Sequence, residues 1–402
     1  MSKPRFPIWG CVALLLSFGI AACNGANLAG RGGPVQLREP DYDQYGPFGF
    51  DRYGRTNPNR TRVALLLPLT GPGSEIGPAM LNAAQMALFD ASDDSFELIP
   101  RDTGGTPHGA ADAASAAIAE GAQLILGPLF GSSVPEVRAV AQSAGLNVVA
   151  FTNDRTVAGG NVLIMGFVPA GQVEQIVQYS ITQGLYRFAA LAPDTAYGGT
   201  VVEAMQEVTE TYGVTLERIQ FYDPAAADVS TTVEQIAEPG LFGTVPYDAI
   251  LVAESGLQLR AISAMLPYYE VTDVQLLGTG VWDGPDLGIE PAMVGGWFAA
   301  PQPELRSDFE ARYQSTFNAP PLRLATLAYD AVALAVALNR MPDGPGYDMD
   351  TLTSTSGFAG MDGVFRFGED GVVDRALAIL EVQPEGPVVR VPAATSFVLA
   401  GS

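Results

Sequence analysis

The stretch ILGPLFGSSVPEV, residues 125–137, decides the fold that this sequence predicts. It runs from an apolar strand-like segment through Gly127, Pro128 and Gly131 into a serine pair and a new amphipathic segment. A buried strand that leads through a short turn into a helix is the unit of a parallel α/β sheet. The serines stand just past the carboxyl end of the strand, where they can cap the helix or bind a ligand at its N-terminus.

The same alternation of strand-like and helix-like segments extends over residues 62–391. Apolar runs such as RVALLLPL (62–69) and YDAILVAE (247–254) are typical of buried strands, and amphipathic runs such as GGTVVEAMQEVTETYG (198–213) separate them. The chain has 402 residues and is 48% apolar, so it is long enough for more than one such sheet. We therefore expect an α/β protein with two doubly wound parallel-sheet lobes.

The N-terminal sequence predicts a bacterial lipoprotein signal. Lys3 and Arg5 precede an apolar run that ends in Ile-Ala-Ala-Cys at residues 20–23, which resembles the lipobox whose cysteine is acylated. We expect residues 1–22 to be removed and Cys23 to carry the lipid, whereas a plain signal peptide cleaved nearby would leave Cys23 without a role. Residues 23–61 contain several Gly and Pro residues and almost no apolar periodicity, which favours a lipidated tether.

The composition excludes several functional classes. The chain carries 21 basic and 44 acidic residues, for a formal net charge of −23, which disfavours nucleic acid as a partner. Lys3 is the only lysine and lies in the predicted signal, so Schiff-base chemistry and a phosphate-loop lysine are excluded. The only histidine, His108, lies in a Gly/Pro-rich turn and has no Cys or His partner for a zinc site. We expect no metal site, no cofactor and no enzymatic activity.

Paired carboxylates are the remaining way in which the protein could be an enzyme. Two acidic groups can cleave a glycosidic bond, and the candidates are the cluster at residues 90–94 and the pair Asp283 and Asp286. Both groups are also typical of solvated turns. A carboxylate-pair hydrolase acting on cell-wall glycan is therefore a third hypothesis behind two binding functions.

The predicted binding residues follow from the sheet topology. Ligands of open parallel sheets bind outside the carboxyl ends of the strands, and in a protein with two such lobes these ends line a cleft. On the first lobe the predicted cleft residues are Thr70, Ser74, Ser132, Ser133, Thr152 and Asn153. On the second lobe they are Tyr197, Glu254, Trp282 and Asp283.

Four segments resemble the type I periplasmic binding proteins, of which the Leu/Ile/Val-binding proteins are well-known members. These segments are LLLPLTGPGSEIGPAMLNAAQMAL (65–88), ILGPLFGSSVPEVRAVAQSAGLNVVAFTND (125–154), YRFAALAPDTAYGGTVVEAMQEV (186–208) and FGTVPYDAILVAESGLQLRAISAML (242–266). The resemblance covers about residues 62–391 and implies two lobes joined by a hinge. The first lobe would comprise residues 62–168 plus about 302–367, and the second residues 169–301 plus about 368–402.

The resemblance also implies roles for the predicted cleft residues. In amino-acid-binding relatives, hydroxyl and backbone N–H groups at the start of the third helix bind the ligand carboxylate, and this implies that role for Ser132, Ser133 and Thr152. A tyrosine and an acidic side chain from the second lobe close around the ammonium group, which implies those roles for Tyr197 and Glu254.

Plain structural roles fit the same residues equally well. Helix capping explains the serine pair without any ligand, and Phe130 beside it would narrow a pocket. Tyr197 and Trp282 also fit packing at a hinge or rim, and Glu254 fits a solvated carboxylate. These alternatives stay open at the level of the sequence.

Two binding functions follow from the resemblance. The segments LLLPLTG and ILGPLFGSSV are more similar to the penicillin-binding protein activator lipoproteins, outer-membrane proteins that stimulate a peptidoglycan synthase. We therefore expect a lipid-anchored regulator of peptidoglycan synthesis on the periplasmic face of the outer membrane, acting by contact with a penicillin-binding protein. Asn24 in place of an Asp after Cys23 favours the outer membrane by the same resemblance. The alternative is a binding protein for an amino acid or related small solute that serves an ABC transporter.

Overall fold

The computed structural model describes residues 60–226, 228–241, 243–284 and 286–397. The predicted signal, Cys23 and nearly all of the tether lie outside the described residues. Within the described residues, no helix combines the length and the apolar character needed to cross a membrane.

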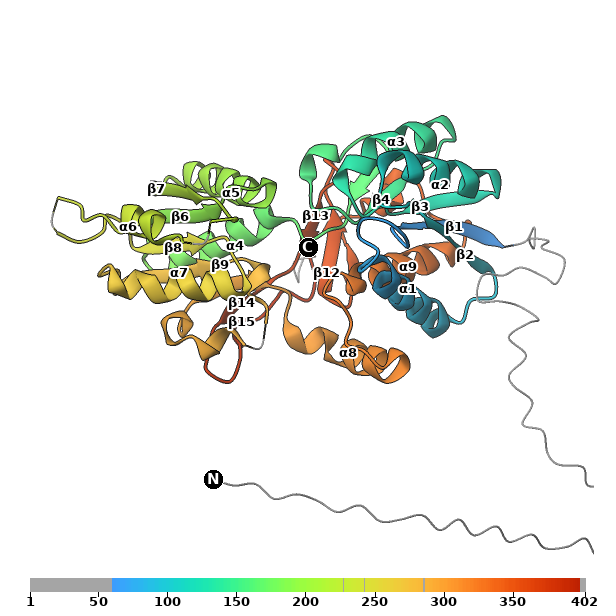
Figure 1. Cartoon of the computed structure of the whole chain (residues 1–402). Helices are drawn as coiled ribbons and strands as arrows, with labels where there is room; N and C mark the ends of the chain where they lie inside the picture. The colour runs from blue at the N-terminus through green and yellow to red at the C-terminus, as the bar shows by residue number, and fades with distance from the viewer. Residues whose placement is uncertain (1–59, 227, 242, 285, 398–402) are drawn as a thin grey trace, which may run out of the picture. The chain divides into compact units, whose positions relative to one another are not determined.

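The first sheet is parallel and has the strand order β2-β1-β3-β4-β5. Its strands are β1 (Thr61–Leu67), β2 (Phe96–Asp102), β3 (Ala122–Leu126), β4 (Val148–Ala150) and β5 (Val162–Ile164). Helices α1 (Gly77–Ala91) and α9 (Ala325–Asn339) pack together on one face, and α2 (Pro107–Ala119) and α3 (Val134–Ser143) on the other (Figure 1). Because both faces are covered, most residues of these strands are apolar and buried.

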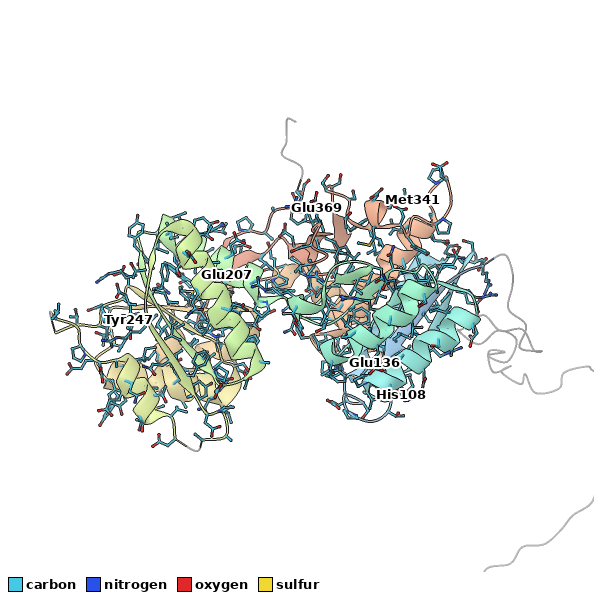
Figure 2. All side chains as sticks on the ribbon, turned by 90° about the horizontal axis from the view of Figure 1, so that it is seen from above. His108, Glu136, Glu207, Tyr247, Met341 and Glu369 are labelled. Carbon is cyan, nitrogen blue, oxygen red and sulfur yellow. The ribbon has the colours of Figure 1, made fainter. Side chains whose placement is uncertain are left out.

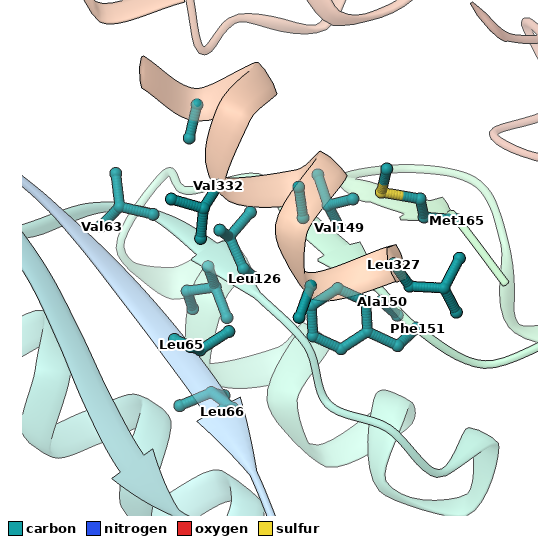
Figure 3. Packing of buried hydrophobic residues seen from close by; sticks show 14 of the residues in the cluster. Val63, Leu65, Leu66, Leu126, Val149, Ala150, Phe151, Met165, Leu327 and Val332 are labelled. Atoms are coloured by element: carbon teal, nitrogen blue, oxygen red, sulfur yellow. The ribbon is translucent and has the colours of Figure 1, made fainter. Parts of the chain in front are cut away.

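One continuous core holds this lobe together. Leu65 of β1, Leu126 of β3 and Val149 of β4 are fully buried, and Leu327 and Val332 of α9 pack over them (Figure 3). Helix α9 reaches this core from far along the chain, so the lobe is built from two separate parts of the sequence.

The second sheet has the order β15-β14-β10-β9-β8-β6-β7. Five strands are parallel, namely β6 (Arg187–Pro193), β7 (Thr215–Tyr222), β8 (Ala249–Val252), β9 (Gln275–Gly278) and β10 (Trp297–Ala300). At one edge β14 (Ala378–Glu381) and β15 (Val388–Val391) add an antiparallel pair. Helices α4 (Pro169–Thr182) and α5 (Ala196–Tyr212) cover one face, and α6 (Ser230–Ile236) and α7 (Gly256–Tyr268) the other.

Local sequence explains where helix α5 begins and ends. Thr195 caps it, because its hydroxyl oxygen accepts a hydrogen bond from the backbone N–H of Gly198 at 3.2 Å. Gly213 ends it with a φ of 64°, a left-handed conformation that glycine adopts at little cost. The apolar residues between them, including Val201, Met205 and Val208, are buried against the sheet.

Within the described residues, the chain passes between the two sheets at three places. The first lies between β5 and α4, and the second lies between β10 and α8 (Pro303–Phe317), whose Phe309 and Tyr313 join the first core. A small antiparallel sheet of β11 (Phe358–Gly360), β12 (Gly363–Phe367) and β13 (Val373–Arg375) follows the short helix α10 (Met349–Leu352). Val373 of β13 also joins the first core, so the third passage follows Arg375 instead of lying at about residue 368. The two doubly wound lobes of the predicted fold are confirmed.

Candidate functional site

A cavity of about 370 Å³ lies where loops from the carboxyl ends of both parallel sheets meet. Asn153 follows β4 of the first lobe, whereas Tyr197 follows β6 and Val281 follows β9 of the second. Phe167, from the first passage between the sheets, and Gln172 of α4 complete one wall with Arg323 and Leu324, which precede α9. This is the place that the topology predicts for a ligand.

A second cavity of about 280 Å³ adjoins the first on the side of the first lobe. The two share Asn153, Phe167 and Leu324. Thr152 lines the second cavity and is buried, and its hydroxyl oxygen accepts a hydrogen bond from the backbone N–H of Asp154 at 3.1 Å. Thr152 and Asn153 therefore lie where the sequence predicts, and their role in binding stays a prediction.

The serine pair lies beside these cavities and not in their walls. Ser132 and Ser133 form a short 3₁₀ turn with Gly131 that leads into α3, and Gly131 alone of the three lines the smaller cavity. Ser133 is 2% exposed and occupies the N-cap position, yet among the described residues its hydroxyl makes no capping hydrogen bond. Ser133 therefore does not cap α3 with its side chain, and a ligand contact of the serine pair stays a prediction.

Thr70 and Ser74 belong to the turn after β1. The hydroxyl of Thr70 donates to Asp102 at 2.6 Å, and Asp102 also accepts from the backbone N–H groups of Leu69 and Gly104 at 2.9 and 2.8 Å. Burial alone would raise the pKa of Asp102, but these hydrogen bonds outweigh it and lower the pKa. Thr70 thus holds the turn together, while the exposed Ser74 contributes a backbone hydrogen bond to Gly71.

Tyr197 lines the larger cavity at the start of α5. Its hydroxyl lies 2.6 Å from the hydroxyl of Thr279, which follows β9. Burial raises the pKa of Tyr197 to about 12, with a smaller contribution from the charge of Glu254. The phenol is therefore neutral at physiological pH and can donate a hydrogen bond.

Glu254 is engaged within the second lobe. Its carboxylate accepts a hydrogen bond from the hydroxyl of Tyr222 and another from the backbone N–H of Ser255 at 2.8 Å. Among the described residues it lines neither of the two cavities. Its predicted position beside a ligand ammonium group stays untested.

The prediction that Trp282 lines the cleft is corrected by its position in the second core. The side chain is 1% exposed, its indole N–H donates to the carbonyl of Val252 at 3.2 Å, and its ring centroid lies 6.1 Å from that of Phe298. A Cβ at Gly278 would come within 2.1 Å of the Trp282 ring, so the glycine makes room for the indole. The neighbouring Val281 faces the cavity instead.

Asp283 borders the cavity as part of a buried ion pair. Its side chain is 5% exposed and lies 2.7 Å from Arg306 of α8 and 3.7 Å from Arg323. Burial raises the pKa of Asp283, and the charges of the two arginines oppose the rise. The carboxylate is neutralised by the protein and is not a free acid facing the cavity.

Arg323 is a site residue that sequence reasoning missed. Its two terminal nitrogens donate to both oxygens of Asp362 at 3.1 and 2.8 Å, and its guanidinium stacks 4.1 Å from the ring of Phe167. A cation directly before a helix N-terminus opposes the helix dipole, and this unfavourable placement was the signal available in the sequence. The guanidinium links the cavity wall to a carboxylate buried below it.

Two further charged residues extend this network into the first lobe. Asp330 of α9 is 2% exposed and accepts from the backbone N–H of Met361 at 2.7 Å. Burial, and then the nearby charge of Asp362, raise its pKa to about 7, whereas the charges of Arg375 and Arg323 oppose the rise. Arg375 donates to the carbonyl of Met165 at 2.9 Å, and burial lowers its pKa.

A family model described as "Periplasmic binding protein" matches residues 60–387. The chain belongs to the periplasmic binding protein family. Its two sheets and the cavity at their carboxyl ends agree with the Leu/Ile/Val-binding type of this family, as the sequence predicts.

Solved structures of periplasmic binding proteins share the fold at low identity. An ABC transporter substrate-binding protein from Sphaerobacter thermophilus is 16% identical, with a TM-score of 0.67 over 84% of this chain and 97% of that chain. The branched-chain amino acid binding protein LivJ from Streptococcus pneumoniae, solved with isoleucine, is 17% identical, with a TM-score of 0.59 over 83% and 100%. At this identity the likeness shows the fold alone.

A curated relative of this periplasmic binding protein is a penicillin-binding protein activator. The penicillin-binding protein activator LpoA of Haemophilus ducreyi is 26% identical over 314 residues, which are 72% of this chain and 49% of the relative. The chain spans about half the length of the curated relatives it matches.

Proposed function

We propose that this protein is a lipid-anchored periplasmic regulator of peptidoglycan synthesis that contacts a penicillin-binding protein. The proposal rests on the similarity to LpoA over 72% of the chain. Too few residues lie outside the two-lobed body to hold a match of this length, so the match must include the body. A relative named as an activator thus shares the part of this chain that the structure describes.

The chemistry of the cavity supports a contact function over an amino-acid receptor. The side-chain oxygen of Gln172 accepts a hydrogen bond from the backbone N–H of Gly280 at 2.7 Å. The hydroxyls of Tyr197 and Thr279 are hydrogen-bonded to each other, and Asp283 forms an ion pair with Arg306. These three polar groups of the cavity wall are therefore already engaged within the protein. A zwitterionic ligand would have to displace these partners to bury both of its charges, which is costly.

The predicted anchor fits this function. Acylated Cys23 would hold the chain at the periplasmic face of the outer membrane, and the segment from residue 24 to residue 59 has a maximum reach of about 120 Å. A body on such an anchor can meet a synthase that works at a distance from the membrane surface.

Cross-linking to the host's purified peptidoglycan synthases tests the proposal. The full chain, extracted in mild detergent, should be captured with one penicillin-binding protein and should raise its glycan polymerisation or peptide cross-linking rate. Because the only lysine lies in the predicted signal, amine-reactive reagents are unsuitable and photo-reactive or carboxylate-reactive reagents are required. Absence of both capture and stimulation with every synthase would contradict the proposal.

A small solute is the second candidate, favoured by the cavity itself. Its volume of about 370 Å³ lies within the range of small-molecule sites, roughly 300–1,000 Å³. A ligand at 100 times its Kd should raise the unfolding free energy by about 2.7 kcal/mol in a thermal-shift screen of amino acids and peptidoglycan fragments. Val281→Trp, which fills the cavity from an exposed position, is the control and should abolish the shift.

The proposed role is non-catalytic. The hydrolase hypothesis needs Asp283 as a free acid, but this carboxylate is paired with Arg306 at 2.7 Å. Incubation with purified sacculi should release no glycan fragments. Release that Asp283→Asn or Asp286→Asn abolishes would instead support the hydrolase.

A further inference from the structure

The second lobe has a recess at the end opposite the carboxyl-end cavity. The parallel strands β6, β8 and β9 begin there, and the loops that lead into them enclose a cavity of about 310 Å³. Its walls include Leu185 and Arg187 before and at the start of β6, Thr244 and Tyr247 before β8, and Val274 before β9 (Figure 2 labels Tyr247). Tyr247 is 2% exposed and donates to the carbonyl of Ile236 at 2.9 Å, so the floor of the recess is rigid.

Exposed apolar side chains lie in or next to these loops: Leu241 and Tyr186 are loop residues, and Tyr268 is the last residue of α7. Leu241 is 99% exposed, Tyr268 is 80% exposed and Tyr186 is 54% exposed. Tyr268 packs edge to face against Tyr269 at 5.1 Å between ring centroids, and Tyr269 in turn packs against the second core. We call these three exposed residues, together with the recess, the distal face. Tyr186 lies in sequence between the recess residues Leu185 and Arg187, and Tyr268 and Leu241 lie close in sequence to the recess residues Glu270 and Thr244. Exposed apolar groups near a recess are typical of a surface that meets another protein.

Among the charged residues that line the recess, those without a counter-charge are negative, and the nearby Arg218, which is not in its lining, donates to the carbonyls of Ile236 and Glu238. Asp248 accepts from the backbone N–H groups of Tyr186 and Arg187 at 3.1 and 3.0 Å, and it also pairs with the Arg187 guanidinium at 2.5 Å. These bonds neutralise Arg187. Glu270 and Asp273 also line the recess, are exposed, and form no ion pair or side-chain hydrogen bond with another described residue.

Glu270 also occupies a backbone position that disfavours it. It follows the end of α7 with a φ of 64°, in the left-handed region where glycine is the usual residue. A carboxylate kept at this position costs stability that glycine would recover. A binding contact made by the Glu270 carboxylate would explain why the protein keeps this loss of stability.

We propose that the distal face binds a basic segment of a partner protein. Lysine or arginine side chains of the segment pair with Glu270 and Asp273, and its apolar groups cover Tyr268 and Leu241. An exposed tyrosine close in sequence to Glu270 suits a cation in particular, because the ring face attracts positive charge. The same negative charge disfavours an anionic membrane surface or a nucleic acid as the occupant. That the segment belongs to a penicillin-binding protein rests on the proposed function.

Two probes separate this proposal from the proposed function. The first is a fluorescent 12-residue peptide of alternating lysine and tyrosine, titrated against the full chain in mild detergent, with a glutamate–tyrosine peptide as the charge-reversed control. The second is the purified penicillin-binding protein that the full chain captures. The variants are Tyr268→Ala, Glu270→Gln with Asp273→Asn, and the matched pair Glu136→Gln with Glu369→Gln, exposed carboxylates on other surfaces of the chain (Figure 2).

The basic peptide should bind the wild-type chain and the glutamate–tyrosine peptide should not. Tyr268→Ala should weaken binding about tenfold, and the paired change at Glu270 and Asp273 should weaken it by up to about fivefold per carboxylate. The matched pair should change binding less than about twofold, since it removes the same charge from other surfaces. Equal losses in both pairs, or no binding of the basic peptide, would overturn the proposal.

Glu270→Gly separates lost binding from lost folding. Glycine relieves the left-handed conformation, so this variant should raise Tm by about 1–3 °C and still weaken peptide binding. A variant that is more stable and binds equally well would count against the proposal. If the captured penicillin-binding protein tolerates all changes on the distal face, the face is not its contact, although the proposed function stands. If the basic peptide binds and no synthase does, the result supports a basic partner at the distal face and contradicts the proposed function.

Discussion

Arg323 and Asp362, which lie 39 positions apart in the sequence, form a bidentate ion pair with nitrogen–oxygen distances of 3.1 and 2.8 Å. The Asp362 side chain is completely buried, whereas 31% of the Arg323 side chain is exposed. Asp362 also accepts from the hydroxyl of Thr326 at 2.6 Å. The pair therefore joins a cavity-lining guanidinium to the turn between β11 and β12.

Asp362→Asn should destabilise the protein by about 3 kcal/mol in urea unfolding, because it leaves the buried part of Arg323 without its counter-charge. Burial alone would raise the pKa of Asp362, but Arg323, Arg375 and Thr326 outweigh it and lower the pKa, so the carboxylate is charged at neutral pH. The control is Asp374→Asn, which breaks an exposed pair with Arg366 and should cost less than about 1 kcal/mol. Similar losses of unfolding free energy in both variants would mean that the buried ion pair stabilises the protein no more than the exposed one.

The pH dependence of stability should change in Asp330→Asn. The pKa of Asp330 is raised from 3.8 to about 7 on folding, so the folded state holds its proton more tightly than the unfolded state. The stability gained from the protonated form is therefore present at acidic pH and is lost as the pH rises through about 7.

Asparagine cannot ionise and keeps the oxygen that accepts from Met361. The variant should therefore lose less stability than the wild type between about pH 5 and pH 8, with a difference of about 1–3 kcal/mol at the upper end. Unfolding curves at several pH values measure this, with the exposed Asp374→Asn as control. Parallel curves for wild type and Asp330→Asn would show that Asp330 ionises normally.

Two helix starts that look alike in sequence should respond differently to alanine. Thr195→Ala removes the hydroxyl that caps α5 and should cost about 1 kcal/mol. Ser133→Ala should cost less than about 0.5 kcal/mol, because the Ser133 hydroxyl makes no capping bond at α3. Equal costs in thermal unfolding would mean that Ser133 caps α3 after all.

Gly278→Ala should cost about 3 kcal/mol or more in unfolding free energy. The new Cβ would lie 2.1 Å from the Trp282 ring, which is held in the second core and cannot move aside. Gly199→Ala is the matched change in α5, where a Cβ meets no atom within 4 Å, and it should stabilise the helix by about 0.5–1 kcal/mol. If Gly278→Ala is as stable as the wild type, the packing around Trp282 is looser than described.

The strands and helices could be predicted because apolar runs and amphipathic periodicity are properties of short stretches of sequence. The apolar run at residues 62–69 became β1, and the amphipathic run at 198–213 became most of α5. Strand order was harder to predict, since the antiparallel pair β14 and β15 joins the second sheet from the far end of the chain.

The candidate site was predictable only where topology alone places a residue. Thr152, Asn153, Tyr197 and Asp283 follow strand ends and do border the two cavities. Trp282 follows a strand end as well, but its ring packs inward, and adjacent loop positions in a sequence carry no mark of which one faces the core.

The sequence by itself determined the fold class, because strand and helix periodicity implied two parallel sheets. It also excluded Schiff-base chemistry, a phosphate-loop lysine and a typical zinc site, because the only lysine lies in the predicted signal and there is only one histidine. Only the tertiary structure decided which polar groups are free. Arg323, Asp283 and Glu254 each find a partner far away in the sequence, at Asp362, Arg306 and Tyr222. Such pairings depend on how whole lobes pack, and no local pattern encodes them.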